Sequence, residues 1–407
     1  MATVKLTADR VLAWRLRRHL LHRPTGTGVD ADPDGVSVVA RLCGVQAQVA
    51  SAAAQAVAAR QAHPAPGTVT AALADRRLLR TWAMRGTLHL LTTADAPAYL
   101  SLLAAARTWE KGAWQRTFVT VRQLDAIAEA TYAALDGRIL TREELAAEIV
   151  ERTGDAGLAD PLASGWGAVL KPLAWQGLLI NGPTRTTERD GGPTRTTDPV
   201  NGPTRTVEPA SGRGRAGRVT FTRPDTYLPD WSGLPDPAVA ATTVVPAYLG
   251  AYGPATPETF DAWLCRGATR KATLRSWFAE LVSTGELVTV AVDGEPAYAR
   301  AADVDDIATA VPVDGVRLLP AFDQWILGPG TKDTMIIPAG RRSSVSLAAG
   351  WIAPTVVHQG RVVGTWTPRD GVPEVTLWPE SPPVPAEQIE AEVARLQTYL
   401  GKDDDDA

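Results

Sequence analysis

The sequence of 407 residues has little of what several common protein classes require. Its 2 cysteines, Cys43 and Cys265, lie far apart and outside any C-x-x-C pair, so we expect neither a disulfide framework nor a cysteine zinc site. No apolar run approaches the roughly 20 residues that a transmembrane helix needs. The first residues lack the apolar stretch of a signal peptide. We therefore expect a cytoplasmic protein with no membrane partner.

Recognisable cofactor and nucleophile motifs are missing as well. The chain has no Walker loop, no dinucleotide-binding glycine fingerprint, no H-E-x-x-H pair and no G-x-S-x-G elbow. The 5 histidines, at positions 19, 22, 63, 89 and 358, are not spaced as a set of metal ligands. We therefore expect no cofactor and no metal ion.

Charge is close to balanced, with 41 Lys and Arg against 45 Asp and Glu and a formal net charge of −4. Bulk charge therefore does not predict a polyanion-binding protein. The positive residues are nevertheless clustered, and clustering is the more useful sign of nucleic-acid contact. The clusters are Arg15-Arg17-Arg18, Arg76-Arg77-Arg80, Arg266-Arg270-Lys271 and Arg341-Arg342.

Hydrophobic periodicity and turn signals predict one order of elements three times. In residues 1–106 we predict helices, including a long alanine-rich one over 37–60, and then a strand, turn and strand over 78–91. The regions 107–235 and 236–314 each repeat three helices followed by a hairpin. Three helices followed by a hairpin is the winged-helix pattern.

From residue 316 onward short strand-like segments replace the helical pattern. An amphipathic helix over 385–400 follows them, with Ile389, Val393, Leu396 and Leu400 on one side. We therefore predict an α+β protein with three winged-helix units, a small barrel or half-barrel within 315–400, and an acidic tail over 401–407.

A ten-residue repeat interrupts the second unit. Asn181-Gly182-Pro183-Thr184-Arg185-Thr186 returns with small changes at 191–196 and 201–206. The repeat offers almost nothing to bury, and we predict a mobile expansion of the wing over 181–217. It is either an insertion without a role or a basic loop that contacts DNA phosphates.

Four segments, in order, carry a resemblance to a known family. They are Val45-Gln46-Ala47-Gln48, the segment from Arg80-Thr81-Trp82 to Arg85-Gly86-Thr87-Leu88-His89, Leu319-Pro320-Ala321-Phe322-Asp323, and Gly350-Trp351-Ile352-Ala353-Pro354-Thr355 with Gly360-Arg361-Val362-Val363-Gly364-Thr365-Trp366. Together they resemble the winged-helix DNA glycosylases of the AlkZ and YcaQ type. The resemblance extends from about residue 7 to residue 400, except for the repeats.

The resemblance implies a C-shaped monomer of three tandem winged helices and a C-terminal β-barrel, acting on double-stranded DNA that carries alkylated purines. Members of the family excise bulky N7-alkylguanines and unhook interstrand crosslinks. Some give producing organisms resistance to their own DNA-alkylating antibiotics. One branch has Gln-x-Asp at the first motif and another Gln-x-Gln, and this chain has the second form.

The chemistry of the lesion explains why two amides suffice as catalytic residues. Alkylation at N7 makes guanine cationic, so the base is already a good leaving group. Gln46 and Gln48 then need chiefly to position a water molecule. A glutamine cannot act as a general base at neutral pH, which restricts the prediction to cationic lesions. The motif holds no lysine that could form a Schiff base, so we expect a monofunctional glycosylase that does not cleave the strand.

Contacts to DNA are predicted for seven further residues. They are Arg85, Thr87 and His89 on the second segment, Arg341 and Arg342 in a loop, and His358 and Arg361 at a hairpin tip.

Structural alternatives to these roles remain at this point. In one alternative, the polar side of the Arg85–His89 strand faces water. In another, Gln46 and Gln48 lie on a solvated helix face, since positions i and i+2 do not share a face. They can reach one site only if the helix starts or breaks there.

Two other functions also remain open. One is a winged-helix transcriptional regulator, which is expected to dimerise on a two-fold site. The other is a protein that sequesters a drug without releasing a base.

Overall fold

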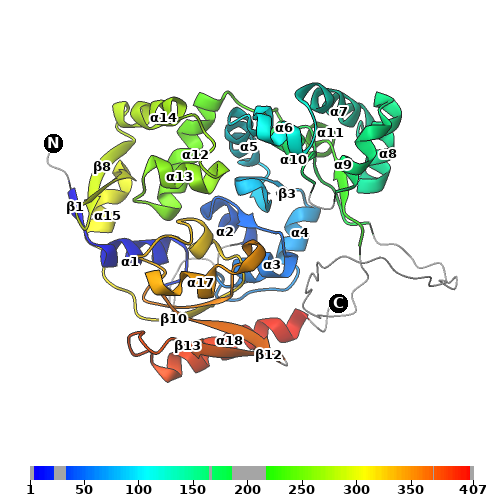
Figure 1. The fold of residues 1–407 in the computed structure, drawn as a ribbon. Coiled ribbons are helices and arrows are strands. Elements are labelled where there is room, and N and C mark those ends of the chain that lie inside the picture. Colours follow the sequence, from blue (N-terminus) through cyan, green and yellow to red (C-terminus); the bar gives the residue numbers. More distant parts are fainter. Residues whose placement is uncertain (1–3, 23–33, 165–166, 186–216, 370, 404–407) are drawn as a thin grey trace.

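The computed structural model of the protein describes residues 4–22, 34–164, 167–185, 217–369 and 371–403 (Figure 1). The predicted α+β class is confirmed, because helices alternate with four small sheets in these ranges. The helices of residues 96–283 occupy the upper part of Figure 1, and the C-terminal sheet lies at the bottom. The second and third copies of the repeat lie outside the described residues.

The first unit is built around a three-stranded sheet of order β2-β4-β3. Its elements are α2 (Gly35–Arg41), β2 (Val45–Gln46), α3 (Ala50–Ala58), α4 (Thr68–Ala74), β3 (Leu78–Trp82) and β4 (Leu88–Thr92). The predicted strand, turn and strand over 78–91 are confirmed. The continuous helix over 37–60 was wrong, because β2 interrupts it.

Two residues with positive φ end α2 and cause the interruption. Cys43 has φ of 54° and Gly44 has φ of 97°. A Cβ atom added to Gly44 would lie 2.7 Å from Leu91 Cδ2, so only glycine fits between the helix and the sheet. The chain therefore leaves the helix here and enters β2.

The second unit repeats this order, with a sheet β5-β7-β6. It follows α5 (Ala96–Ala105) and α6 (Gly112–Thr117). Its elements are α7 (Val121–Ala134), β5 (Leu140–Thr141), α8 (Arg142–Thr153), α9 (Ala159–Ala163), α10 (Lys171–Trp175), β6 (Ile180–Asn181) and β7 (Thr220–Thr222), followed by α11 (Pro224–Tyr227). A capping box begins α8, since Thr141 and Glu144 bond reciprocally to each other's backbone amides.

The third unit contains the predicted helices and hairpin. They are α12 (Pro237–Tyr252), α13 (Pro257–Cys265), α14 (Lys271–Ser283), β8 (Leu287–Val292) and β9 (Glu295–Arg300). A single bridge from Ala255 to Tyr298 stands where the other two units have their first strand. In all three units the segment after the first helix therefore pairs with the last strand.

The N-terminal segment does not join the sheet of the first unit. Its strand β1 (Val4–Leu6) pairs in parallel with β8 of the third unit. The helix α1 (Ala8–Arg18) then packs on α12 and on α15 (Val304–Ala308). Residues 4–18 were predicted within a unit spanning 1–106, but β1 pairs with the third unit, and α1 packs between that unit and the C-terminal part.

The C-terminal strands form an open sheet, which replaces the predicted barrel. Its order is β10 (Val316–Leu319), β11 (Thr355–His358), β12 (Arg361–Arg369) and β13 (Val372–Leu377). In the described part of the chain, β10 and β13 are the two edges and do not pair with each other. The final helix α18 (Ala386–Asp403) packs Ile389, Val393 and Leu396 on this sheet, as predicted. One helix therefore covers the apolar surface that barrel closure would otherwise bury.

A fully buried ion pair joins the first unit to the C-terminal part. Arg60 follows α3 and donates two hydrogen bonds of 2.8 Å to Asp323, and both side chains have 0% exposure. Asp323 also accepts from the Trp325 amide at the start of α16 (Gln324–Leu327). Such a pair replaces the hydration that both charges lose on burial, so removal of either partner is costly.

We expect Asp323→Asn to lower the free energy of unfolding by about 3–5 kcal/mol, because Arg60 would remain buried without a counter-charge. The asparagine retains an oxygen that can cap the Trp325 amide, which limits the change to the ion pair. Urea titration followed by tryptophan fluorescence measures the difference.

Glu374→Gln is the matched control, since it removes one carboxylate from an exposed pair with Arg369. Its unfolding free energy should stay within about 1 kcal/mol of the unmodified protein. Equal losses of unfolding free energy in the two variants would show that the buried ion pair stabilises the protein no more than the exposed one.

Candidate active site

Gln46 belongs to a polar row that crosses the first sheet. It pairs with His89 on β4, and His89 pairs on its other side with Thr81 on β3. Directly opposed side chains of antiparallel strands share a face of the sheet. Gln46 is 6% exposed and the other two are 0% exposed. The glutamine is therefore held at the rim of a buried polar strip rather than on a solvated helix.

Arg85 fixes the amide of Gln46. It lies in the turn between β3 and β4 with φ of 58°. Its Nη2 atom donates to Gln46 Oε1 at 3.1 Å, and its Nη1 atom donates to the Trp263 carbonyl oxygen at 3.3 Å. Because the guanidinium occupies the amide oxygen, Gln46 presents its amide N–H group to other partners.

Gln48 lies beyond the end of β2 and is exposed. The Ala47 amide donates to the Leu88 carbonyl at 2.7 Å, and the Leu88 amide approaches Gln48 Oε1 at 3.5 Å. The two glutamines thus lie within the break between α2 and α3, which is the condition under which both can serve one site. Gln46 is held rigidly, whereas the contact that holds Gln48 is long and weak.

The Arg85 side chain is half-buried, and its guanidinium has neutral hydrogen-bond acceptors. Burial, followed by repulsion from Arg266 in the third unit, lowers the pKa of Arg85 to about 10. The group therefore stays protonated at neutral pH. None of the ion pairs within the described ranges includes Arg85, and its charge is left without a carboxylate.

A cavity of about 310 Å³ opens beside Arg85. Lys171 and Trp175 of the second unit and Cys265 and Arg266 of the third unit contribute to its wall. Trp114 and Phe118 from α6 and the residue that follows it supply further aromatic surface. Residues of all three units therefore line the cavity, which lies beside the hairpin of the first unit.

The structure changes the expectations for Thr87 and His89. Thr87 closes the turn by donating from Oγ1 to the Met84 carbonyl at 3.2 Å. The His89 ring is fully buried, and its Nδ1 atom lies 3.0 Å from the Thr87 carbonyl oxygen. The ring has no exposed surface in this conformation, so the DNA contact of His89 stays a prediction that requires the ring to become exposed. Its role is to support the polar row.

Three of the four late basic residues are engaged inside the protein. Arg341 pairs with Glu380, and His358 lies 3.1 Å from Asp314 while only 7% exposed. Arg361 donates to Asp9 and to the Met335 carbonyl. Their DNA contacts stay predictions that require these bonds to exchange.

Arg342 differs from them, because it is exposed and bonded through Nε to Thr331 Oγ1 at 3.3 Å. It is the late arginine that keeps an open guanidinium, and its predicted DNA contact also remains untested.

The hairpin tip between β11 and β12 does not project freely. A Cβ atom on Gly360 would lie 3.0 Å from Leu12 of α1, and the Gly360 carbonyl accepts from Trp325 Nε1 at 3.2 Å. The helix α1 thus covers the tip that was expected to probe a groove.

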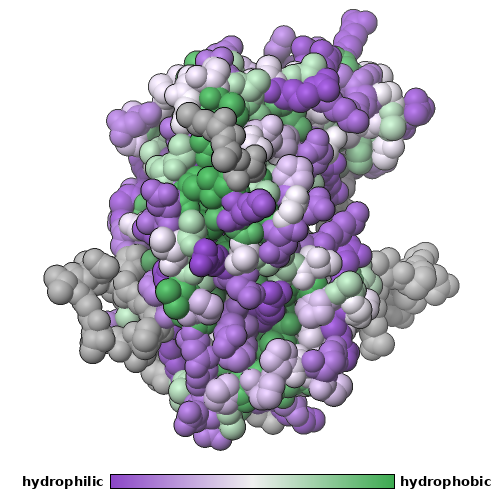
Figure 2. Space-filling view, turned by 90° about the vertical axis from the view of Figure 1, so that its left-hand side faces the viewer, coloured by the Kyte–Doolittle hydropathy of each residue, from purple (hydrophilic) through white to green (hydrophobic). Residues whose placement is uncertain are grey.

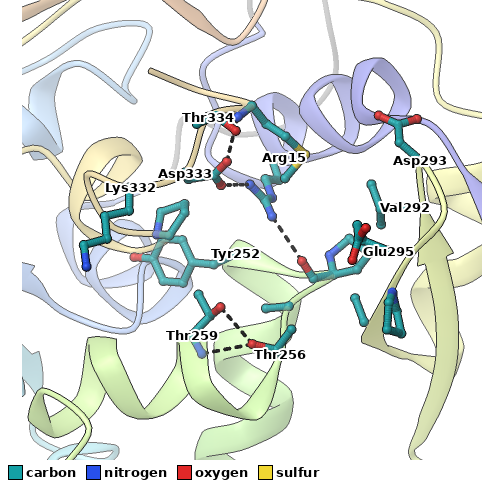
Figure 3. A pocket seen from close by; sticks show the side chains of 16 residues that line it. Arg15, Tyr252, Thr256, Thr259, Val292, Asp293, Glu295, Lys332, Asp333 and Thr334 are labelled. Carbon is teal, nitrogen blue, oxygen red and sulfur yellow. Dashed lines mark hydrogen bonds and ion pairs between the residues drawn. The ribbon is translucent and has the colours of Figure 1, made fainter. Parts of the chain in front are cut away.

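A larger cavity, of about 460 Å³, lies between α1, the end of α12, the β8–β9 hairpin and the loop at 329–335 (Figure 3). Arg15 is central there, but it is satisfied by Asp333 at 3.2 Å and by the carbonyls of Gly253 and Pro254. Neither Gln46 nor Arg85 is among its lining residues, whereas Arg85 lines the smaller cavity. We therefore place the candidate active site at Gln46 and Arg85.

Sequence reasoning missed the part of the site that comes from other units. Arg266 was noted only as a member of a positive cluster, and Lys171 and Trp175 carried no signal at all. These residues are remote from Arg85 in the chain, and only the packing of α10 and α13 against the first hairpin brings them together.

Comparisons with known proteins agree along the whole chain. A family profile described as DNA glycosylase AlkZ-like matches residues 39–399. A protein of Streptomyces sahachiroi named interstrand DNA cross-link repair glycosylase is 42% identical over 400 residues, covering 98% of this chain and 98% of that protein. The solved structure of Streptomyces sahachiroi DNA glycosylase AlkZ matches with a TM-score of 0.84 over 98% of each chain, at 42% identity.

The buried ring of His89 should make stability depend on pH. Burial, and then the charge of Arg85, lower the pKa of His89 to about 3, against about 6.5 in an unfolded chain. Between these values the unfolded state binds more protons. His89 therefore lowers the free energy of unfolding as pH falls below about 6.5, by on the order of 1 kcal/mol per pH unit.

We expect His89→Asn, which can still donate to the Thr87 carbonyl, to lose less stability between pH 6.5 and 4 than the unmodified protein. Urea titrations at several pH values measure the two slopes. His19 is also buried with a lowered pKa, but it is present in both proteins and cancels in the comparison. Parallel slopes would be inconsistent with a neutral buried His89.

Proposed function

Because this chain belongs to the AlkZ-like family of DNA glycosylases, we propose that it excises bulky N7-alkylguanines from double-stranded DNA and unhooks interstrand crosslinks between such bases. The observation that carries this proposal is the full-length match to a glycosylase named for interstrand crosslink repair. The Gln46–Arg85 contact adds a chemical reason, because it orders an amide without providing a base.

The two glutamines divide the positioning of water in this proposal. Gln46 donates an amide N–H to the water oxygen, since Arg85 occupies its carbonyl oxygen. Gln48 Oε1 accepts a hydrogen from the same water, since its contact to the Leu88 amide is long. Such fixed contacts lower the barrier by orientation and need no group that titrates near pH 7.

The bond changes balance without a catalytic acid or base. The water oxygen forms a bond to the anomeric carbon while the bond from that carbon to N9 breaks. The electron pair of the broken bond neutralises the cationic alkylguanine, which leaves uncharged. The former water loses one proton to solvent, and an abasic site remains. This balance holds only for a base that is charged before the reaction.

We also propose that the three repeated units are winged helices that surround the duplex as a C. The support is their shared topology, in which the segment after the first helix pairs with the last strand. The space-filling view shows an indentation in the outline between the upper and lower parts of the molecule (Figure 2). In this arrangement the protein works as a monomer, with the first unit starting near α2 because α1 packs elsewhere.

Antibiotic self-resistance follows as a biological consequence of the same proposal. An organism that makes a DNA-alkylating compound would be protected by an enzyme that releases its adducts. Genes for such a pathway next to this one would support that role.

The direct test uses a duplex with one N7-alkylguanine, incubated with the protein and then treated with mild alkali to cleave abasic sites. We expect release of the base by the unmodified protein and about a 100-fold slower single-turnover rate for Gln46→Ala, because one positioned donor is lost. A duplex crosslinked through two N7 atoms, resolved on a denaturing gel, tests unhooking.

Gln55→Ala is the control, since it removes a half-buried amide from α3, close to the motif in sequence. An undiminished rate for Gln46→Ala would refute the assigned role. Tight binding of a free alkylating drug without release of a base would favour sequestration instead. Selective binding of undamaged DNA by a dimer would favour a regulator.

The mechanism predicts a rate that is nearly independent of pH. The pKa of Arg85 is about 10 and that of His89 about 3, and glutamine does not titrate. We expect the single-turnover rate constant, corrected for spontaneous loss of the base, to vary less than about twofold from pH 5 to pH 8. A tenfold rise per pH unit would instead reveal a general base.

A further inference from the structure

Three cationic side chains line the cavity beside the β3–β4 hairpin. They are Arg85, Lys171 and Arg266, and no Asp or Glu is among its described lining residues. Arg85 and Lys171 are half-buried and Arg266 is exposed. None of the three forms an ion pair within the described ranges of the chain, whereas the buried Arg15 and Arg60 do. A cavity with this balance of charge has no internal counter-ion.

The three charges also repel one another. Lys171 lies beside the turn of Arg85, since a Cβ atom on Gly86 would be 3.8 Å from Lys171 Cδ. Burial lowers the pKa of Lys171, and repulsion from Arg266 adds to that effect. An anion between them would relieve both the repulsion and the loss of hydration.

The walls have unused hydrogen-bonding capacity as well. Trp175 Nε1 and Thr108 Oγ1 belong to lining residues, and both atoms are buried without a partner in the described structure. Asp261 is the carboxylate behind this wall, but its Oδ1 atom already accepts from Cys265 Sγ and from the Thr269 amide. Asp261 therefore makes its hydrogen bonds with Cys265 and Thr269, and it forms no ion pair with the three cations.

The cationic lesion is a poor occupant of this space. An N7-alkylguanine would bring a fourth positive charge next to three that have no counter-ion. The groups that suit it are the phosphates of the DNA backbone, which guanidinium and ammonium groups bind by charge-assisted hydrogen bonds. The aromatic residues Trp114 and Phe118 can cover the sugar that adjoins such a phosphate.

We propose that the cavity of Arg85, Lys171 and Arg266 binds one phosphodiester of the damaged strand and thereby positions Gln46. The inference rests on the proposed function, because it assigns the anion to the DNA substrate. The altered base then lies on the other side of Gln46, away from the cations. The bound phosphate offsets the charge of Arg85 when the sugar becomes cationic in the transition state.

The test uses a duplex with a 2′-fluorinated N7-methylguanine nucleotide, which resists hydrolysis and fixes the register. Each phosphate near the lesion is replaced in turn by a neutral methylphosphonate, and binding is measured by fluorescence anisotropy. We expect one position at which the replacement weakens binding about tenfold, the loss of one charge-assisted contact. At that position the replacement should change little for the double variant Lys171→Gln/Arg266→Gln.

The salt dependence of binding gives an independent measurement. The slope of log K against log salt should fall by about 1 for each phosphate contact that a variant loses. Lys171→Arg keeps the charge and should retain the full slope. Arg10→Gln removes an exposed charge of α1 outside the cavity, and it should retain the methylphosphonate effect in full.

Equal methylphosphonate losses in the unmodified protein and the double variant at every position would overturn the proposal. Thermal unfolding of each variant shows whether it folds, and Lys171→Gln alone repeats the test if the double variant does not. Excision by the unmodified protein is scored separately. If the base is released but the methylphosphonate losses are the same in the unmodified protein and the double variant, only the phosphate site is refuted. If the losses differ between the two proteins but no base is released, the proposed function is refuted.

Discussion

The ion pair of Arg60 with Asp323 is the contact on which the position of the catalytic segment depends. Arg60 ends the turn after α3, and the break that carries Gln48 stands immediately before that helix. Asp323 starts α16, whose Trp325 donates to the hairpin of the C-terminal sheet. Two charges without water have strict geometric requirements. The ion pair holds α3 between the sheet of the first unit and the C-terminal sheet. It thereby fixes the position of the segment before α3, which carries Gln46 and Gln48.

Local signals accounted for most helices and hairpins. The Thr141 capping box and the Asp293-Gly294 turn specify their elements through residues only a few positions apart. The break at Gly44 was not foreseen, because the alanine-rich flanks favour helix and the reason for the break is the contact with Leu91. The barrel was expected from the strand-like segments and from the family resemblance, whereas closure depends on what covers the edges and faces of the sheet, here α18.

The site was only partly accessible to sequence reasoning. The link between Gln46 and Arg85 joins two segments that the family resemblance had already placed together. Alternation along β4 indicated that His89 differs from its neighbours, but period two does not say which face of a strand is buried. Lys171 and Arg266 were out of reach, because their proximity to Arg85 arises from how separate units pack and not from any pattern within one unit.

The parallel pairing of β1 with β8 has a consequence for how the chain is made. The Ala8 amide donates to Asp293, a residue 285 positions later. During synthesis the first strand leaves the ribosome early and waits, unpaired, while the first two units can already fold. The chain's first residues are therefore among the last to find their place, and a nascent chain halted before β8 would carry an open strand and an undocked α1.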